Sequence, residues 1–501
     1  MGSNFQSVAG GLDTRSLPMR GVVGQTLAIG PVFSAGFLSG TVAVFAGFNT
    51  PLSVLLASAG TVALAYVLTL YGRRFAGPGV VYEYLVRGVH PAVGIVGTGV
   101  YLCGLVFLGA GGGFVAEGYL LNRLLTSQLS FDAGWLPWAL TCLLVAVAVN
   151  YAGVRVGIRV LVATAMISAA ALLVVAVAVV ARGGAAGNTL SVFEPRQTSW
   201  GGVFHGVLFA VSLFIGFETV AALGEEAKLP RRSIPAAMVI SIGACAGFYL
   251  LVTYAGAIGF GKVGARTAWF ASGDPFGELG QRYVGQAFGW IINVALVLDL
   301  FSVCVAFTLA ASRVLMVLAR DRLLPRPFSS TSRRFHSPTG GLAGVAAGGL
   351  TVTTWSAFAH FGATARTPGV LEAVLILSAS GTYLITFVYL LLALGGLRAL
   401  AVKKARGGWW WQLPAVLSAM AVPALSFDGS LDPFPTYPND IAVYFAVGSL
   451  GLALAWYVLV RSRRPDVMGT AAAHAESADL LGTTPASAPG SSRRESTPSL
   501  R

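Results

Sequence analysis

The chain has 501 residues, of which 55% are hydrophobic and only 11% are charged, and its mean hydropathy is +0.74. Soluble domains contain about 25% charged residues, so this composition excludes a soluble globule and predicts an integral membrane protein. The formal net charge is +13. Basic residues are retained on the cytoplasmic side of membrane proteins and contact anionic lipid there. The positive charge is therefore assigned to topology, and no nucleic-acid partner is expected.

Windows of about 20 apolar residues, the length that crosses a bilayer as a helix, predict twelve membrane spans. A polar arm over 1–20 precedes them. A tail over 462–501, rich in Ala, Ser, Thr, Pro and Gly, follows them and is typical of a disordered cytoplasmic segment. The expected spans are 21–48, 51–71, 93–121, 136–153, 157–181, 201–223, 234–260, 285–318, 340–361, 370–395, 411–427 and 440–460.

The basic residues also predict the orientation of the chain, because short cytoplasmic loops keep Lys and Arg. If the N-terminus lies inside, 26 of the 33 Lys and Arg residues fall inside and 7 fall outside. Both termini are therefore expected in the cytoplasm. The excess of Ala, Gly and Arg over Lys is typical of a GC-rich gene and favours a bacterial inner membrane.

The four cysteines form no CxxC pair, which indicates neither a disulfide framework nor a metal site.

The sixth span contains a glutamate, Glu218, inside the apolar segment 212–224. A charge inside a membrane costs about 2.5–3.5 kcal/mol even on the scale derived from insertion experiments. Intramembrane ionisable groups usually face a cavity, so we expect a role in binding or gating. A carboxylate that only holds helices together is the alternative.

The first span is interrupted by the segment 29–34, Ile-Gly-Pro-Val-Phe-Ser. Proline breaks the hydrogen bonding of a helix, and a break at mid-membrane is tolerated only beside protein or a cavity. Pro31 suits the first position of a second half-helix, which leaves the amides of Val32, Phe33 and Ser34 facing an anion. A simple proline kink is the alternative.

The first and sixth spans lie five helices apart, and both are interrupted by glycine. This is the pattern of two inverted repeats that each contribute a broken helix to a site at mid-membrane. Because five is odd, the second repeat is expected upside down relative to the first. The expected organisation is a first repeat over 21–181, an outer loop over 182–200, a second repeat over 201–395 and two further spans within 396–461.

Two more sets of polar residues lie inside expected spans. Asp299 in the eighth span is a candidate acceptor of a proton or cation, and a hydrogen-bonded structural role is the alternative. Thr164 and Ser168 in the fifth span have hydroxyls that usually bond their own helix backbone. The glycines of the third span, at 109 and 111–113, predict close helix packing. The basic end of the eighth span, 313–322, is interpreted as a topology anchor.

Several of these segments resemble the amino acid–polyamine–organocation permeases, and the likeness covers about 15–460. It implies an all-α integral membrane fold of the LeuT type, with two inverted five-helix repeats, two additional C-terminal helices and discontinuous helices 1 and 6. It also implies secondary active transport by alternating access. The matching segments are Phe214-Ile-Gly-Phe-Glu218 with Glu225-Glu226, Pro230-x-Arg232-x-Ile-Pro235, and Ser312-Arg313 leading to Ala319-Arg-Asp-Arg-Leu-Leu-Pro325.

The resemblance also implies a substrate site. The carboxylate of an amino acid would lie on the amides at the first break, and its amino group on the carbonyls at the sixth, as the dipoles of the half-helices favour. Glu218 resembles the gating or coupling glutamate of the family. The implied substrate-binding residues are Ile29, Gly30, Val32, Phe33, Ser34, Phe214, Ile215, Gly216 and Phe217.

Two departures from the family leave the substrate and the coupling ion open. Pro31 stands where the family usually has its second glycine, which removes an amide donor. The position of a coupling lysine found in some relatives corresponds to Ser168. Ser168 with Ser302 would lie by a sodium-like site, or Glu218 and Asp299 would carry a proton.

The leading hypothesis is a proton- or cation-coupled amino acid transporter, and no cofactor is expected. An amine or polyamine transporter, or an amino acid antiporter, is the alternative within the same fold. A membrane enzyme is disfavoured because the spans contain no grouped catalytic or metal-binding side chains. A channel is disfavoured because no pore-lining polar residues recur at helical spacing. The expected partners are a small amino acid or amine and the lipid bilayer, with the protein a monomer or homodimer.

Overall fold

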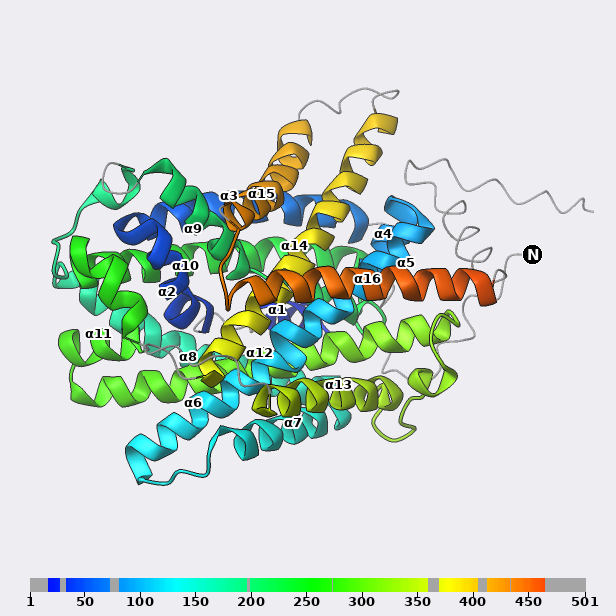
Figure 1. Cartoon of the computed structure of the whole chain (residues 1–501), viewed down its shortest axis with the longest axis horizontal. Coiled ribbons are helices and arrows are strands. Elements are labelled where there is room, and N and C mark those ends of the chain that lie inside the picture. Colours follow the sequence, from blue (N-terminus) through cyan, green and yellow to red (C-terminus); the bar gives the residue numbers. More distant parts are fainter. Residues whose placement is uncertain are drawn as a thin grey trace, which may run out of the picture.

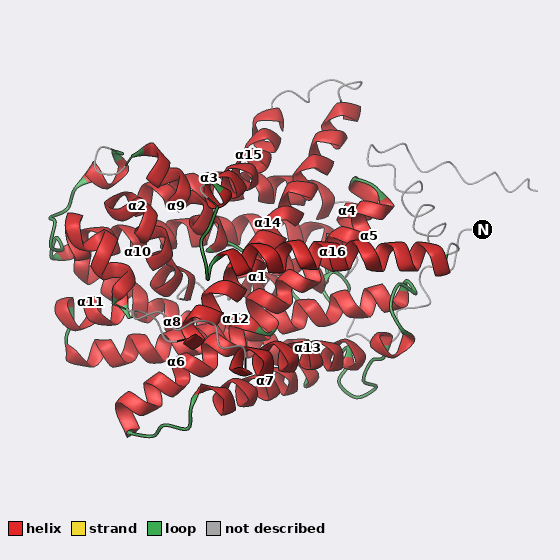
Figure 2. Cartoon of the chain, viewed as in Figure 1, coloured by secondary structure: helices red, strands yellow, loops and turns green. Residues whose placement is uncertain are grey.

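The computed structural model describes residues 17–27, 33–72, 81–195, 199–272, 274–358, 369–403, 412–432 and 434–464. These residues are almost entirely helical and include no β-strand, as Figure 2 shows, apart from one isolated bridge between Leu17 and Ala227. An all-helical fold suits a membrane protein, because a helix satisfies its own backbone hydrogen bonds in lipid.

Helices occupy the described parts of the first five expected spans. The first expected span contains α1 and, after residues 28–32, which lie outside the described residues, the segments that begin at Phe33. These elements are α1 (Met19–Leu27), η1 (Phe33–Leu38), α2 (Ser39–Ala46), η2 (Gly47–Asn49), α3 (Thr50–Gly72), α4 (Val81–Gly88), α5 (Pro91–Leu105), η3 (Val106–Ala110), α6 (Gly112–Leu129), α7 (Trp135–Tyr151) and α8 (Val154–Ala181).

The rest of the chain continues in the same way, and the sixth expected span is divided between α9 and η5. The elements are η4 (Leu190–Phe193), α9 (Trp200–Ser212), η5 (Phe217–Leu223), α10 (Pro230–Ala271), α11 (Pro275–Tyr283), α12 (Gln286–Arg320), η6 (Arg326–Ser329), α13 (Thr339–Phe358), α14 (Gly369–Lys403), α15 (Leu413–Leu431) and α16 (Asp440–Arg463).

Nine helical segments of the described residues are long and apolar enough to cross a membrane. One of them, Phe33–Tyr71, covers the second half of the first expected span and all of the second. A shorter apolar helix, Trp135–Tyr151, matches the fourth expected span. The expectation of an all-α integral membrane protein is confirmed, and the count of twelve spans stays a prediction.

Two glycines set the course of the chain at points where helices meet. Gly47 has φ 53° and lies between α2 and α3, and Gly261 has φ 75° inside α10. Only glycine adopts such backbone angles without a steric penalty. Gly261 therefore divides α10 close to residue 260, where the sequence predicted the seventh span to end.

The glycines of the third span allow α12 to approach closely, as the sequence predicted. A Cβ on Gly109 would collide with the ring of Phe307, and one on Gly113 would lie 2.9 Å from Sγ of Cys304. α12 also packs against α7, α8 and α13. Figure 1 shows most helices running side by side, with α15 and one end of α14 projecting from the bundle. α12 is thus a buried helix against which the candidate site is built.

Candidate functional site

The sixth span is broken in its middle. α9 ends at Ser212, and a turn over residues 213–216 leads to η5, a 3-10 helix. Gly216 has φ 116°, which suits glycine. No described residue donates a hydrogen bond to the carbonyl oxygens of Leu213, Phe214 or Ile215. Buried carbonyls without donors are uncommon, so the end of α9 offers acceptors to a cation or an amine.

Glu218 lies at the start of η5 with only 1% of its surface exposed. The Tyr101 hydroxyl, from α5, donates to Oε1 at 3.0 Å, and the Tyr389 hydroxyl, from α14, donates to Oε2 at 2.5 Å. The N–H of Gly216 also donates to Oε2, at 3.0 Å. Hydrogen bonds to a charged acceptor are roughly twice as strong as neutral ones. These three donors therefore stabilise the carboxylate and tie the broken span to two other helices.

The predicted break of the first span falls on residues 28–32, which lie outside the described residues, between Leu27 of α1 and Phe33 of η1. Three residues predicted for the substrate site, Ile29, Gly30 and Val32, lie outside the described residues.

Phe33 and Ser34 are described at the start of η1 and are buried. The backbone N–H of Phe33 donates to Oδ2 of Asp299 at 2.7 Å. The Ser34 side chain lies beside Tyr249 of α10. An amide expected to face a substrate anion is thus held by a carboxylate of the protein itself.

Sequence reasoning missed a third carboxylate, Glu117 on α6. Its side chain is 1% exposed, and its Oε2 atom has no hydrogen-bond partner among the described residues. Glu117 interacts electrostatically with Asp299. Residue 117 falls inside the expected third span, 93–121, so the argument from the cost of a buried charge would have identified it.

The hydroxyls of Ser168 and Ser302, which are predicted near a sodium-like site, have different hydrogen-bond partners. The hydroxyls of Thr164 on α8 and Ser302 on α12 contact each other, and Ser302 also donates to the carbonyl of Leu298 at 3.0 Å. Ser168 donates to the carbonyl of Thr164 at 2.8 Å, which is the backbone bonding expected of a hydroxyl within a helix. Ser302 is therefore paired with Thr164, and Ser168 lies one turn further along α8.

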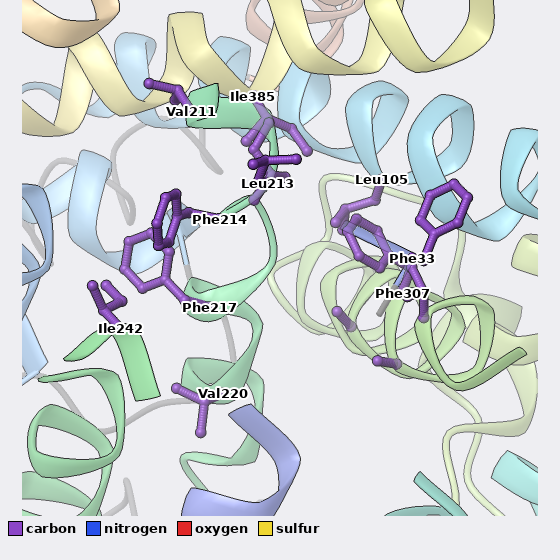
Figure 3. Close-up of a cluster of buried hydrophobic side chains, with 14 of the residues drawn as sticks. Phe33, Leu105, Val211, Leu213, Phe214, Phe217, Val220, Ile242, Phe307 and Ile385 are labelled. Carbon is purple, nitrogen blue, oxygen red and sulfur yellow. The ribbon is translucent and has the colours of Figure 1, made fainter. Parts of the chain in front are cut away.

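A small cavity lies beside the break in the sixth span. Its volume is about 10 Å³, which is room for about one water molecule and far less than an amino acid requires. Figure 3 shows the rings of Phe214 and Phe217 on the side of Ile242, with Phe33 beside Phe307. A substrate can enter this cavity only if the elements that line it move. The cavity is lined by Thr26, Leu213, Phe214, Phe217, Ser241, Ile242, Cys245 and Tyr249.

Two ion pairs join the segment after η5 to the end of α12. Arg313 is fully buried and donates to Oε1 of Glu226 through Nε at 3.2 Å and, more closely, through Nη2. Arg320 donates to Glu225 at 2.9 Å. The sequence indicated only a topology anchor here, whereas Arg313 lies inside the fold and forms a buried pair.

The chain just before α1 is bound to the same segment. The N–H of Leu17 donates to the carbonyl of Glu226 at 2.8 Å, and the N–H of Lys228 donates to the carbonyl of Leu17 at 3.0 Å. The beginning of the first span, the end of the sixth and the end of α12 are therefore connected at one end of the bundle. We call this group of residues, 17, 225–228, 313 and 320, the terminal latch.

The described residues contain no group of three or more His, Cys, Asp or Glu side chains able to hold a metal ion. Apolar helices of membrane-spanning length, with buried carboxylates around interrupted helices, define a multi-pass membrane protein with a polar centre. The sequence profile described as "Amino acid permease" matches residues 25–458. The chain therefore belongs to the amino acid permease family, whose members are transporters and not enzymes.

Individual relatives match parts of the chain. It is 31% identical to cationic amino acid transporter 3, mitochondrial, of Arabidopsis thaliana, over 28% of this chain and 22% of that protein. It is 31% identical to an uncharacterized transporter of Mycobacterium tuberculosis, over 50% of this chain and 56% of that protein. It is 29% identical to a branched-chain amino acid permease of Bacillus subtilis, over 28% of this chain and 29% of that protein. The chain thus spans between about a fifth and about half of the length of these curated relatives.

Proposed function

We propose that this protein is a secondary active transporter that moves an amino acid across the membrane. The observation that carries the proposal is the broken sixth span, where the buried carbonyls of Leu213, Phe214 and Ile215 accept no hydrogen bond from the described residues. The C-terminal end of a half-helix favours a cation, so these carbonyls suit the amino group of an amino acid. The amides at the start of η1, at Phe33 and Ser34, suit its carboxylate.

Transport proceeds by alternating access in this proposal. The cavity of about 10 Å³ corresponds to a closed site, and its lining comes from α1, the sixth span and α10, which must separate to admit a substrate. The terminal latch closes one end of the bundle. The proposal includes twelve spans in two inverted repeats, over 21–181 and 201–395, with both termini in the cytoplasm of a bacterial cell.

The relatives guide the choice of substrates. Cationic and branched-chain amino acids, the classes in their names, are the first candidates. A second candidate is an amine without a carboxylate. Asp299 favours an amine, because its side chain already accepts the hydrogen bond of the Phe33 N–H group. Pro31 favours an amine as well, because proline has no backbone N–H group.

Uptake by the purified protein in proteoliposomes tests the proposal. Labelled L-arginine, L-lysine, L-leucine and L-isoleucine are offered beside putrescine, first in counterflow without a gradient and then with a pH or sodium gradient. Saturable exchange of an amino acid, absent from empty liposomes, is the expected result. Exchange of putrescine alone selects the second candidate. A single-channel current without exchange of any solute would rule out both.

A further inference from the structure

The packing of α6 on α12 brings two buried carboxylates together. From η3 into α6 the contacts move toward the start of α12: Gly109 of η3 lies against Phe307, and Gly113 of α6 lies against Cys304. One turn beyond Gly113 is Glu117, and five residues before Cys304 is Asp299. The two carboxylates therefore face each other across the interface, in agreement with their electrostatic interaction.

Glu117 lacks the donors that stabilise Glu218. Its Oε2 atom has no hydrogen-bond partner among the described residues, and the thiols of Cys142 from α7 and Cys304 from α12 are its other titratable neighbours. Cys245 and Tyr249 face Asp299 from α10. A buried ionised carboxylate with an oxygen that has no donor is costly, and a second carboxylate beside it adds repulsion. A single bound proton relieves both costs.

The surroundings favour a proton over a metal cation. Hard cations take about six or more oxygen ligands, whereas Glu117 is flanked by thiols, which are weak hydrogen-bonding groups. The hydroxyls of Thr164 and Ser302 are already in contact with each other. A proton needs only one carboxylate oxygen.

We propose that Glu117 and Asp299 form a proton-binding pair, and that proton uptake by this pair releases the Phe33 amide for the carboxylate of the substrate. The amide is bound to Oδ2 of Asp299 at 2.7 Å, and such a bond is about twice as strong when the acceptor is ionised. A proton taken from one side of the membrane onto the pair weakens that bond, and its release to the other side restores it. The coupling step rests on the proposed function, whereas the proton-binding pair does not.

Infrared difference spectroscopy tests the pair without any substrate. Between about pH 6 and pH 9 exposed carboxylates stay ionised, because their ordinary pKa is about 4. A carboxylic-acid carbonyl band that changes in this range therefore reports buried acids. The wild type is expected to show this band, and Glu117→Gln is expected to lose or weaken it. The matched control, Glu278→Gln, alters an exposed carboxylate and is expected to keep it.

A spectrum of Glu117→Gln that is identical to the wild type overturns the pair. Size-exclusion chromatography in detergent confirms that the variants are folded. If Glu117→Gln does not fold, Asp299→Asn is measured in its place, and an unchanged band in that variant overturns the pair equally.

Transport tests the coupling step. A gradient of one pH unit drives about tenfold accumulation at one proton per substrate. Glu117→Gln is expected to exchange the amino acid that the wild type exchanges at a rate that no longer depends on pH, while its accumulation falls from about tenfold to none. Full accumulation by this variant overturns the coupling step. If the wild type exchanges no amino acid, the proposed function fails instead, and the infrared spectra still decide the proton-binding pair.

Discussion

Carboxylates are stabilised in different ways at the centre of the bundle and at its end. In the terminal latch, guanidinium groups neutralise Glu226 and Glu225. At the centre, Glu218 is held by two tyrosine hydroxyls and one amide, and Asp299 by the Phe33 amide. Opening a buried ion pair is costly, because separating the two side chains leaves an unpaired charge inside the protein. Neutral donors at the centre are more easily exchanged for a substrate or a proton.

The centre itself contains two kinds of carboxylate. Glu218 has donors on both oxygens, so it suits a gating role in which it joins the sixth span to α5 and α14. Glu117 has an oxygen without a partner among the described residues, so it suits binding of a mobile proton. The comparison predicts that removing the charge of Glu218 perturbs the fold and all transport, whereas removing that of Glu117 perturbs coupling alone.

The largest effect is expected from Arg313→Ala in the terminal latch. Removing one partner of a buried ion pair costs about 3–5 kcal/mol, because the other charge stays buried and uncompensated. The variant should lose its folded size-exclusion peak at a much lower temperature than the wild type in detergent.

The double variant Arg313→Met with Glu226→Gln is the control for that experiment. It removes both charges, so it should recover much of the lost stability. A single variant as stable as the wild type would show that the guanidinium does not neutralise Glu226 in the folded protein.

A smaller effect is expected from Glu218→Gln. The glutamine amide places an N–H₂ group against hydroxyl and amide donors, so at least one donor loses its acceptor, at a cost of about 1–3 kcal/mol. Thermal stability in detergent should fall, and counterflow and driven accumulation should fall together. Glu117→Gln, with counterflow retained, is the matched comparison. Normal counterflow in Glu218→Gln would remove the distinction between the two carboxylates.

Tyr389→Phe and Tyr101→Phe each remove one of the hydroxyl donors to Glu218. Its hydroxyl lies 2.5 Å from Oε2, whereas the hydroxyl of Tyr101 lies 3.0 Å from Oε1. Short hydrogen bonds to an ionised acceptor are the stronger ones, so Tyr389→Phe should cost about 1.5–2 kcal/mol and Tyr101→Phe somewhat less. Melting curves and counterflow rates of the two variants, measured side by side, check this order. A reversed order would contradict the geometry around Glu218.

The sequence predicted where the sixth span is interrupted but not which side chains meet there. The break in the sixth span follows from a glycine and a glutamate in an apolar segment, and Glu218 and Asp299 stand out by the cost of burying a charge. The two tyrosines that donate to Glu218 are 117 and 171 residues away from it along the chain. Tyrosines are common inside membrane proteins, so no local pattern marks Tyr101 or Tyr389.

Other parts of the site were missed for different physical reasons. Glu117 carries the same signal as Glu218 and was accessible from the sequence, because it lies in an equally apolar span. The pairing of Arg313 with Glu226, 87 residues apart, was not accessible from the sequence, because arginines near the end of a span also fit a topology anchor. The Phe33–Asp299 contact depends on the packing of α12, which periodicity alone does not determine.

The smallest effect is expected from Arg320→Ala, because Arg320 is less deeply buried than Arg313. The side chains of Arg320 and Glu225 retain 19% and 24% exposure, and partly hydrated pairs contribute about 1 kcal/mol or less. Burial raises the pKa of Glu225, and the Arg320 guanidinium acts in the opposite direction, so the variant leaves a carboxyl that takes up a proton more readily. Stability should change little and depend less on salt than in the wild type. A loss as large as that of Arg313→Ala would show that both pairs of the terminal latch are equally shielded from water.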